Sequence, residues 1–251
     1  MGIGADFTLT TYRTLLESAL AGDYQFTTFL GFVNNPVSNS VILRHDVDKL
    51  PQNSLETAKI EASLGVQGTY YFRIVPKSFD REIIHQISSL GHEIGYHYED
   101  LTICKGNNEK ALQHFIRSLE TFRNEAEIKT ICMHGSPLSK WDNRDLWKTY
   151  SYKEFGIIAE PYFDLDFNEI LYLTDTGRNW NNAGSLRDKV ESKFNTHFNS
   201  TNEIIRAFKN KELPDKIMFN FHPQRWTNSN SLWMKELVFQ NIKNTIKKTI
   251  R

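Results

Sequence analysis

VILRHDVD, residues Val41–Asp48, is the stretch that decides the fold. It joins an apolar, β-branched run to Arg44, His45, Asp46 and Asp48. An apolar run of this length is typical of a buried strand. Charged side chains at its carboxyl end are costly to desolvate unless they serve a function. In folds built of parallel strands, ligands and catalytic groups lie at the carboxyl ends of the strands. The stretch therefore predicts both a central strand and one part of a functional site.

Three later segments repeat this arrangement of an apolar run that ends in a histidine. HEIGYH (92–97) ends in His97, TICMH (130–134) in His134 and IMFNFH (217–222) in His222. One histidine at the end of a strand is more often structural than functional. Four such strands indicate a shared site, provided that the strands are parallel neighbours whose carboxyl ends converge.

Strand-like and helix-like segments alternate along the chain, while residues 23–40 look irregular. The predicted strands are 41–46, 69–72, 93–97, 129–133, 156–159, 170–173 and 216–221, and the predicted helices are 7–21, 51–64, 79–90, 107–125, 141–150, 201–209 and 231–250. This alternation predicts an α/β fold with mainly parallel strands and helices outside. No glycine-rich dinucleotide turn follows the first strand. Because the chain has 251 residues and candidate site residues at its strand ends, we favour a distorted, TIM-barrel-like (β/α)7 barrel over an open sheet. We expect 1–251 to be a single domain, with 1–40 as an N-terminal helical extension.

The composition argues against several classes of partner. Thirty basic and thirty acidic residues cancel, so no charge excess favours nucleic acid or a membrane surface. No run of apolar residues is long enough to span a membrane. Met1–Asp6 lacks the charged and then apolar stretch of a signal peptide, and Cys104 and Cys132 do not suggest a disulfide framework. A cytoplasmic location is therefore expected.

The strand-end residues match the donor set of a catalytic metal site. Asp46 and Asp48 face the same way on a strand, and two close carboxylates repel unless a cation lies nearby. Asp48 can bind one divalent ion together with His97 and His134, whose imidazoles suit zinc, cobalt, nickel or iron. Asp46 then accepts a proton from water. His222 lies on the last strand, which neighbours the first in a barrel, and can protonate a leaving group.

Structural interpretations stay open for several of these residues. Asp46 and Asp48 can simply cap the turn into the next segment, and Arg44 can be the buried partner of a carboxylate. His45 points away from the two aspartates on an alternating strand. His92 opens its strand, at the end away from the expected chemistry. We interpret both histidines as structural.

Four motifs resemble those of the polysaccharide deacetylase family, also known as NodB homology or carbohydrate esterase family 4. They are RHDVD (44–48), GHEIGYH (91–97), MHGSP (133–137) and FHPQRW (221–226). The resemblance covers about residues 40–225. It implies a distorted barrel, a divalent metal and hydrolysis of an N- or O-linked acetyl group on a sugar. It also implies that Asp46 is the base, Asp48 and His97 are metal ligands, and His222 is the general acid.

The chain departs from the family pattern at three points. Leu101 stands where the second family motif has a further histidine. Val47 separates the two acids of the first motif, and no glycine follows them. HGSP (134–137) replaces an arginine–proline motif. We expect His134 to supply the missing ligand, with Glu99 or Asp100 as substitutes.

TDTGRNW (174–180) holds three further candidates. Asp175, Arg178 and Trp180 can support the site, Asp175 by pairing with His222 to keep it protonated. An ordinary polar turn is an equal alternative for this segment.

The sequence thus predicts a metal-dependent carbohydrate deacetylase that holds one divalent ion, with zinc as the first choice. Its expected partner is an acetylated carbohydrate, a precursor of a surface polysaccharide, with no nucleic acid and no membrane span. A catalytically impaired sugar-binding barrel is one alternative, for which Leu101 is the main support. Phosphoryl or glycosyl transfer is another, because Asp46-Val47-Asp48 matches a DxD motif.

Overall fold

Strand β2 (Ser40–Val47) lies at the centre of a seven-stranded sheet, and every pairing between named strands is parallel. The computed structural model describes residues 5–180 and 187–250. The strand order is β5-β4-β3-β2-β7-β6, and β1 pairs with β2 off this path. The other strands are β1 (Gln25–Thr27), β3 (Thr69–Phe72), β4 (Glu93–Tyr98), β5 (Ile128–Met133), β6 (Leu171–Thr174) and β7 (Lys216–Phe221).

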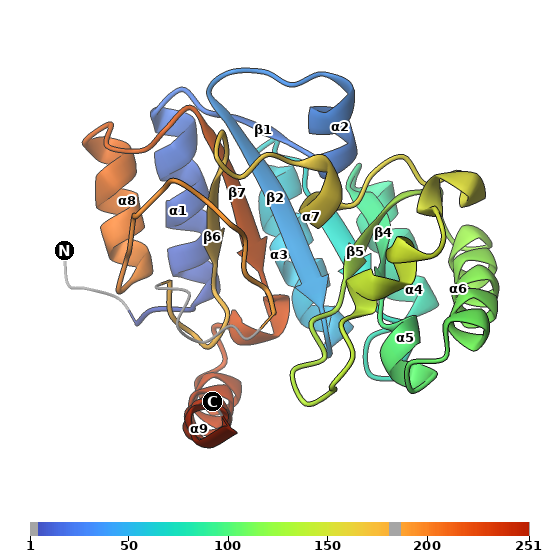
Figure 1. Ribbon diagram of the computed structural model, residues 1–251. Helices are drawn as coiled ribbons and strands as arrows, with labels where there is room; N and C mark the ends of the chain where they lie inside the picture. Colours follow the sequence, from blue (N-terminus) through green and yellow to red (C-terminus); the bar gives the residue numbers. More distant parts are fainter. Residues whose placement is uncertain (1–4, 181–186, 251) are drawn as a thin grey trace.

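The strands follow one another in chain order around an incomplete barrel (Figure 1). β3, β4 and β5 continue from one side of β2, while β7 and then β6 lie on the other side. Among the described residues β5 and β6 do not pair, so the sheet is not closed there. The α/β fold with parallel strands is confirmed. The last strand, β7, pairs with β2, which is the first of the predicted strands. Side chains from distant parts of the chain therefore meet at the carboxyl ends of β2 and β7.

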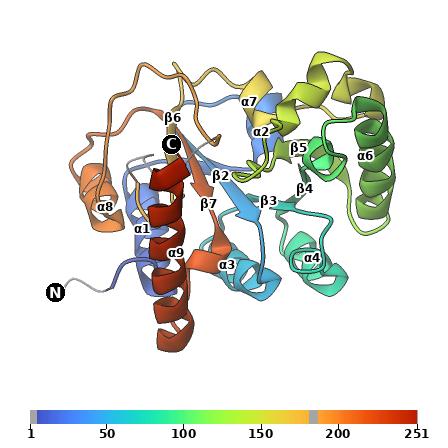
Figure 2. The same cartoon turned by 60° about the horizontal axis from the view of Figure 1, so that its bottom comes forward.

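The helices lie around the sheet, and α9 extends beyond the carboxyl ends of β2 and β7 (Figures 1 and 2). The longer helices are α1 (Leu9–Ala21), α2 (Phe29–Asn34), α3 (Pro51–Ser63), α4 (Arg81–Ser89), α6 (Asn108–Arg123), α8 (Thr201–Lys209) and α9 (Asn230–Ile250). The shorter ones are α5 (Asp100–Ile103), η1 (Asn143–Lys148), η2 (Tyr152–Phe155), α7 (Pro161–Asp164) and η3 (Pro223–Arg225). No described helix combines the length and apolarity that crossing a bilayer requires.

Two predictions about elements are wrong, those for 156–159 and 23–40, and the predicted helix at 141–150 is confirmed only in part. The expected strand at 156–159 forms only a single bridge, between Ala159 and Thr130, because Pro161 begins α7 almost immediately and leaves no extended length. The expected helix at 141–150 is the shorter 3-10 helix η1. Residues 23–40 are not irregular throughout, since they contain β1 and α2. The first forty residues are therefore more than a helical extension, because β1 belongs to the sheet.

Helix α2 closes the amino-terminal end of the barrel interior. Thr28 caps it by accepting a hydrogen bond from the Gly31 N–H, as residues with a side-chain oxygen do at helix starts. Phe29 and Phe32 are buried against the interior cluster. The strand residues of that cluster include Ile42, Tyr71, Cys132, Tyr172 and Met218. With this end filled by apolar side chains, the opposite end is left for polar groups.

Gly95 on β4 gives the barrel interior room for an aromatic ring. A Cβ atom at position 95 would lie 2.3 Å from two ring carbons of Tyr71, far closer than non-bonded atoms approach. The Tyr71 hydroxyl is hydrogen-bonded to the Thr130 hydroxyl at 2.9 Å, so the ring is held in place.

Both cysteines, Cys104 and Cys132, are free.

Candidate active site

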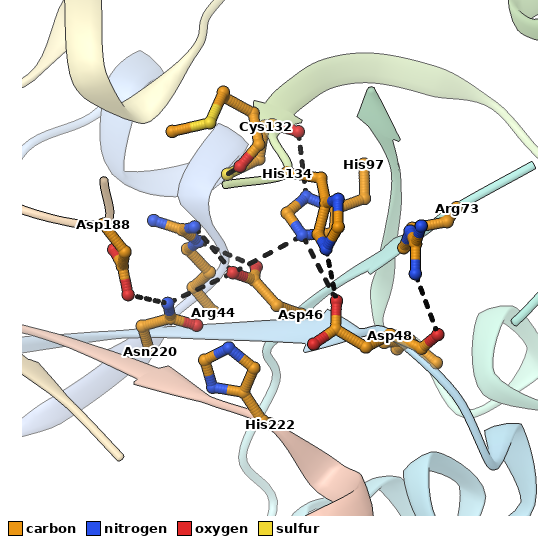
Figure 3. Close-up of polar contacts among 12 residues, drawn as sticks. Arg44, Asp46, Asp48, Arg73, His97, Cys132, His134, Asp188, Asn220 and His222 are labelled. Atoms are coloured by element: carbon orange, nitrogen blue, oxygen red, sulfur yellow. Dashed lines mark hydrogen bonds and ion pairs between the residues drawn. The ribbon is translucent and has the colours of Figure 1, made fainter. Parts of the chain in front are cut away.

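The carboxyl ends of β2, β4, β5 and β7 border one pocket of about 510 Å³. Its volume lies in the range of small-molecule sites. All five residues that the sequence singled out for metal binding or catalysis line it, namely Asp46, Asp48, His97, His134 and His222. Figure 3 shows Asp46 between the imidazoles of His97 and His222, with Asp48 below His134. The parallel register of β2 with β3 and β7 brings these segments together.

Asp48, His97 and His134 form a group of donors that can hold a metal ion. Asp48 Oδ1 lies 3.9 Å from His97 Nε2 and 3.3 Å from His134 Nε2, and the three donor atoms lie within 4.8 Å of one another. Asp48 Oδ1 is buried and has no partner with hydrogen-bond geometry. A buried, unsatisfied carboxylate oxygen facing two imidazole nitrogens suits a divalent cation.

Hydrogen bonds at the far side of each imidazole fix its orientation. His97 Nδ1 lies 2.9 Å from the Cys132 carbonyl oxygen, and His134 Nδ1 lies 2.9 Å from Glu99 Oε2. Each Nδ1–H therefore donates to its oxygen, and Nε2 is the ring atom nearest Asp48. This is the usual support of a metal-binding histidine. Burial lowers the pKa of His97 to about 4, which keeps its ring neutral at neutral pH.

The two substitutes expected for His134 are used elsewhere. Glu99 accepts hydrogen bonds from His134 and from Arg73 Nε at 2.8 Å, so it supports the imidazole rather than facing the other ligands. Burial favours the neutral acid, but His134 and Arg73 outweigh it and lower the pKa of Glu99 to about 2. Asp100 is fully buried and accepts from the Tyr96 hydroxyl. Leu101 is buried in the apolar core.

Asp46 is held as an ion by its neighbours. Arg44 donates to both carboxylate oxygens, at 2.9 and 2.7 Å, and Asn220 donates to Oδ2 at 3.1 Å. Burial alone would raise the pKa of Asp46, but the charges of Arg44, His97 and His222 outweigh it and lower the pKa. The expectation that Arg44 is a buried carboxylate partner is confirmed.

A second group of possible donors, Asp46, His97 and Cys132, is less suited to a metal. Arg44 already occupies both oxygens of Asp46. Burial raises the pKa of the Cys132 thiol well above its ordinary value, whereas a metal ligand must be a thiolate. The Asp48 group is therefore the better candidate.

His222 forms the predicted pair with Asp175. Its Nδ1 lies 2.6 Å from Asp175 Oδ1, and its backbone N–H donates to Oδ2 at 3.0 Å. Arg225 and the Trp226 indole also donate to Asp175, so the carboxylate is fully surrounded by donors. With Nδ1 bonded, the Nε2 atom of His222 is left for the pocket (Figure 3).

Arg178 and Trp180 do not belong to the site. Arg178 lies over the rings of Phe7 and Trp233, 4.8 Å from each centroid, and Trp180 is fully buried in the core. The chain turns through Gly177 and Arg178, which both have positive φ. This turn follows Thr176, which still lines the pocket, and Arg178 and Trp180 do not line it.

The sequence analysis missed Asp188, which lines the pocket, and Asn220, which donates hydrogen bonds to Asp46 and Asp188. Asp188 accepts hydrogen bonds from Tyr162, Tyr172 and Asn220, among others. No pattern marks Asp188, because it lies on neither a strand nor a helix. Asn220 lies two positions before His222 on β7, and the period of two along a strand is a signal that could have found it.

The two histidines interpreted as structural are confirmed as such. His45 Nε2 lies 2.9 Å from Glu61 Oε1, with its ring stacked on Tyr70. His92 is bonded to the Ala58 carbonyl and to the Gly68 N–H. Both side chains are buried on the outer face of the sheet, away from the pocket lining.

Comparison with protein-family models, curated proteins and solved structures finds no match to this chain in any of the three. The functional interpretation therefore rests on the geometry described above and on the motif resemblance.

Proposed function

We propose that the protein is a metal-dependent hydrolase that removes an N- or O-linked acetyl group from a carbohydrate. One observation carries the proposal. Asp48, His97 and His134 converge on one point, their imidazoles are held from behind, and Asp46 and His222 face the same pocket. A metal donor set flanked by an acid and a base is the arrangement that hydrolysis of an acyl group requires.

Asp48, His97 and His134 would hold the metal. Two imidazoles and one carboxylate form a ligand set of catalytic zinc, and cobalt, nickel or iron also accept these donors. When bound, the ion supplies Lewis acidity to the acetyl carbonyl and lowers the pKa of the attacking water toward roughly 7.

Asp46 would accept the proton of the attacking water. Arg44 and Asn220 fix the carboxylate in one orientation, which favours transfer along a defined direction. The lowered pKa of Asp46 makes it a weak base, so its role depends on a water that is already acidified.

His222 would donate a proton from Nε2 to the departing amine or alcohol as the bond to the acetyl carbon breaks. Asp175 accepts a hydrogen bond from Nδ1–H and so orients the ring with Nε2 toward the pocket. Met133, Pro137 and Leu138 add apolar surface to the pocket. Such surface suits a sugar ring and an acetyl methyl group. A precursor of a surface polysaccharide is the substrate that we favour.

Phosphoryl transfer through the DxD motif is disfavoured by one contact. That chemistry needs a carboxylate that is free to attack, whereas Arg44 holds both oxygens of Asp46. The impaired-barrel alternative predicts that a sugar binds and that no acetate is released. Measuring acetate release therefore decides between this alternative and the hydrolase.

The test compares the wild type with Asp48→Ala and His97→Ala. Metal content is measured on purified protein, and acetate release on a panel of N- and O-acetylated sugars. We expect about one divalent ion per wild-type chain, loss of the ion in both variants and metal-dependent acetate release. Asp145→Ala and His85→Ala, whose side chains are 46% and 54% exposed, are the matched controls.

Full metal occupancy in both site variants would end the assignment of the metal centre. A metal-loaded wild type that binds acetylated sugars and releases no acetate would replace the hydrolase with a binding module. Thermal unfolding of each variant shows whether a loss reflects the site rather than the fold.

A further inference from the structure

The active-site pocket is more cationic than the chain as a whole. Seven arginine and lysine side chains but only five carboxylates line it, whereas the sequence has thirty of each class. Arg44 pairs with Asp46 inside this pocket, and Arg73 pairs with Glu99. The excess lies among cations at the pocket mouth, where the connections after β2 and β7 meet α9.

Three of these cations form what we call the rim cluster, namely Lys49, Arg225 and Lys243. They come from the segment after β2, from η3 and from α9. The ammonium groups of Lys49 and Lys243 lie 5.2 and 4.5 Å from the centroid of the same ring, that of Phe239. Arg225 is 7% exposed, and its Nε has no hydrogen-bond partner. The structure thus gathers three positive charges from distant segments.

One cation of the rim cluster has no carboxylate partner. Glu236 pairs with Lys49 at 2.8 Å, and Asp175 accepts from Arg225. No described carboxylate forms an ion pair with Lys243 or with Lys77, a further lysine of the pocket. Partial burial and the charges of Lys49 and Arg225 lower the pKa of Lys243, which is the electrostatic cost of this arrangement.

We propose that the rim cluster binds a phosphate or pyrophosphate ester attached to the acetylated sugar. This inference rests on the proposed function, because it places the sugar ring beside Asp48. The ammonium group of Lys243, which forms no ion pair with a described carboxylate, supplies a positive charge for the phosphate. The free Nε–H of Arg225 adds a donor of the kind that binds phosphate oxygens.

Two sources share this chemistry, a nucleotide-linked sugar and a lipid-linked sugar. Helix α9 offers a way to separate them. It turns Glu236 and Gln240 toward the pocket, while Val238 and Ile242 are 52% and 54% exposed on the same helix and do not line the pocket. A lipid chain would contact these apolar side chains, and a nucleoside would not need them.

The test is isothermal titration of the metal-loaded protein with N-acetylglucosamine and with N-acetylglucosamine 1-phosphate. We expect the phosphate to bind about tenfold more tightly, as one or two charge-assisted contacts provide. Lys243→Gln should remove most of this preference and leave binding of the neutral sugar unchanged. Lys235→Gln, an exposed lysine of α9 outside the pocket lining, is the matched control.

Equal affinity for both sugars in the wild type would overturn the inference, and so would an equal loss in the Lys235→Gln control. Its failure is distinct from that of the hydrolase. Phosphate-dependent binding without acetate release from any sugar supports the rim cluster and refutes the hydrolase. Acetate release with the same KM for phosphorylated and neutral sugars supports the hydrolase and refutes the rim cluster.

A second pair of ligands identifies the source of the phosphate. UDP-N-acetylglucosamine and a prenyl-pyrophosphate-linked N-acetylglucosamine in detergent are titrated into the wild type and into the double variant Val238→Ser, Ile242→Ser. If the prenyl ligand binds the wild type more tightly than the nucleotide sugar does, and the double variant loses this difference, the substrate is lipid-linked. If the nucleotide sugar binds the wild type more tightly, and the double variant keeps this difference, the substrate is nucleotide-linked. Failure of both to exceed the neutral sugar refutes the rim cluster.

Discussion

Replacing Glu99 with Gln is the most informative perturbation of the metal centre, because it changes one atom that lies outside the ligand set. The carboxylate accepts from His134 Nδ1 through Oε2 and from Arg73 through Oε1. A glutamine keeps the shape but offers only one acceptor. If its oxygen faces His134, its NH2 group opposes the Arg73 donor. If it flips, the NH2 group faces Nδ1, and the His134 proton must move to Nε2, the atom that would bind the metal.

Either orientation weakens metal binding. Outer contacts of this kind are worth 10- to 100-fold in metal affinity. This range corresponds to about 1.4–2.8 kcal/mol at 25 °C. Glu99 is 5% exposed, so solvent cannot replace the lost acceptor. We therefore expect the dissociation constant of Glu99→Gln for zinc to rise by about 10- to 100-fold, with one ion still bound at saturation.

The assay is competition titration of metal-free protein with zinc and a chromophoric chelator. Glu125→Gln is the matched control, because Glu125 also accepts from an imidazole, that of His85 at 2.9 Å, and from Arg81 at 3.2 Å, but lies outside the pocket lining. An unchanged zinc affinity in Glu99→Gln refutes the geometry of His134 described here. An equal loss in the Glu125→Gln control would show that the effect is not specific to the site.

Two further predictions concern the scaffold. Gly95→Ala places a methyl group against the Tyr71 ring, so the free energy of unfolding measured by urea titration should fall by about 1–3 kcal/mol. An unchanged urea midpoint would contradict this prediction. Gly22→Ala is the control, because a Cβ atom at position 22 would make no contact under 3.4 Å. Burial raises the pKa of Glu160 to about 7, above that of an unfolded glutamate. The folded state then binds the proton more tightly, so stability falls as pH rises from about 4.5 to 7, by on the order of 3 kcal/mol. Glu160→Gln should remove this fall in stability. If the free energy of unfolding of the wild type instead rises relative to that of the variant between pH 4.5 and 7, the raised pKa of Glu160 is refuted.

Local sequence patterns were sufficient for the strands that carry the site. Residues 41–47 of VILRHDVD are buried in β2, and Asp48 directly follows them. His97 lies in β4, and His134 and His222 directly follow β5 and β7. The reason is that a buried strand leaves a continuous apolar run, and a charged group at its end stands out against that run. The pairing of Asp175 with His222 was also predicted, although it joins residues 47 positions apart.

The pattern failed where an element is short or where neighbours in space decide. β1 and α2 are too short for a hydrophobic period to be visible, and they are stabilised by contacts with β2 and with the barrel interior. The segment at 156–159 is apolar enough for a strand, but α7 begins too soon after it. Arg178 and Trp180 follow Asp175 closely, yet a turn with positive φ separates them from the pocket.

The sequence by itself determined the alternation of strands and helices, the residues at the strand ends and the metal-type character of Asp48, His97 and His134. Only the tertiary structure decided that Glu99 supports His134 rather than replacing it, and that Arg44 holds Asp46 as an ion. Only the tertiary structure gathered Lys49, Arg225 and Lys243 at the pocket mouth. The physical reason is range, because secondary structure follows from near neighbours, whereas charge pairing and ligand geometry depend on ångström distances between side chains far apart in the chain.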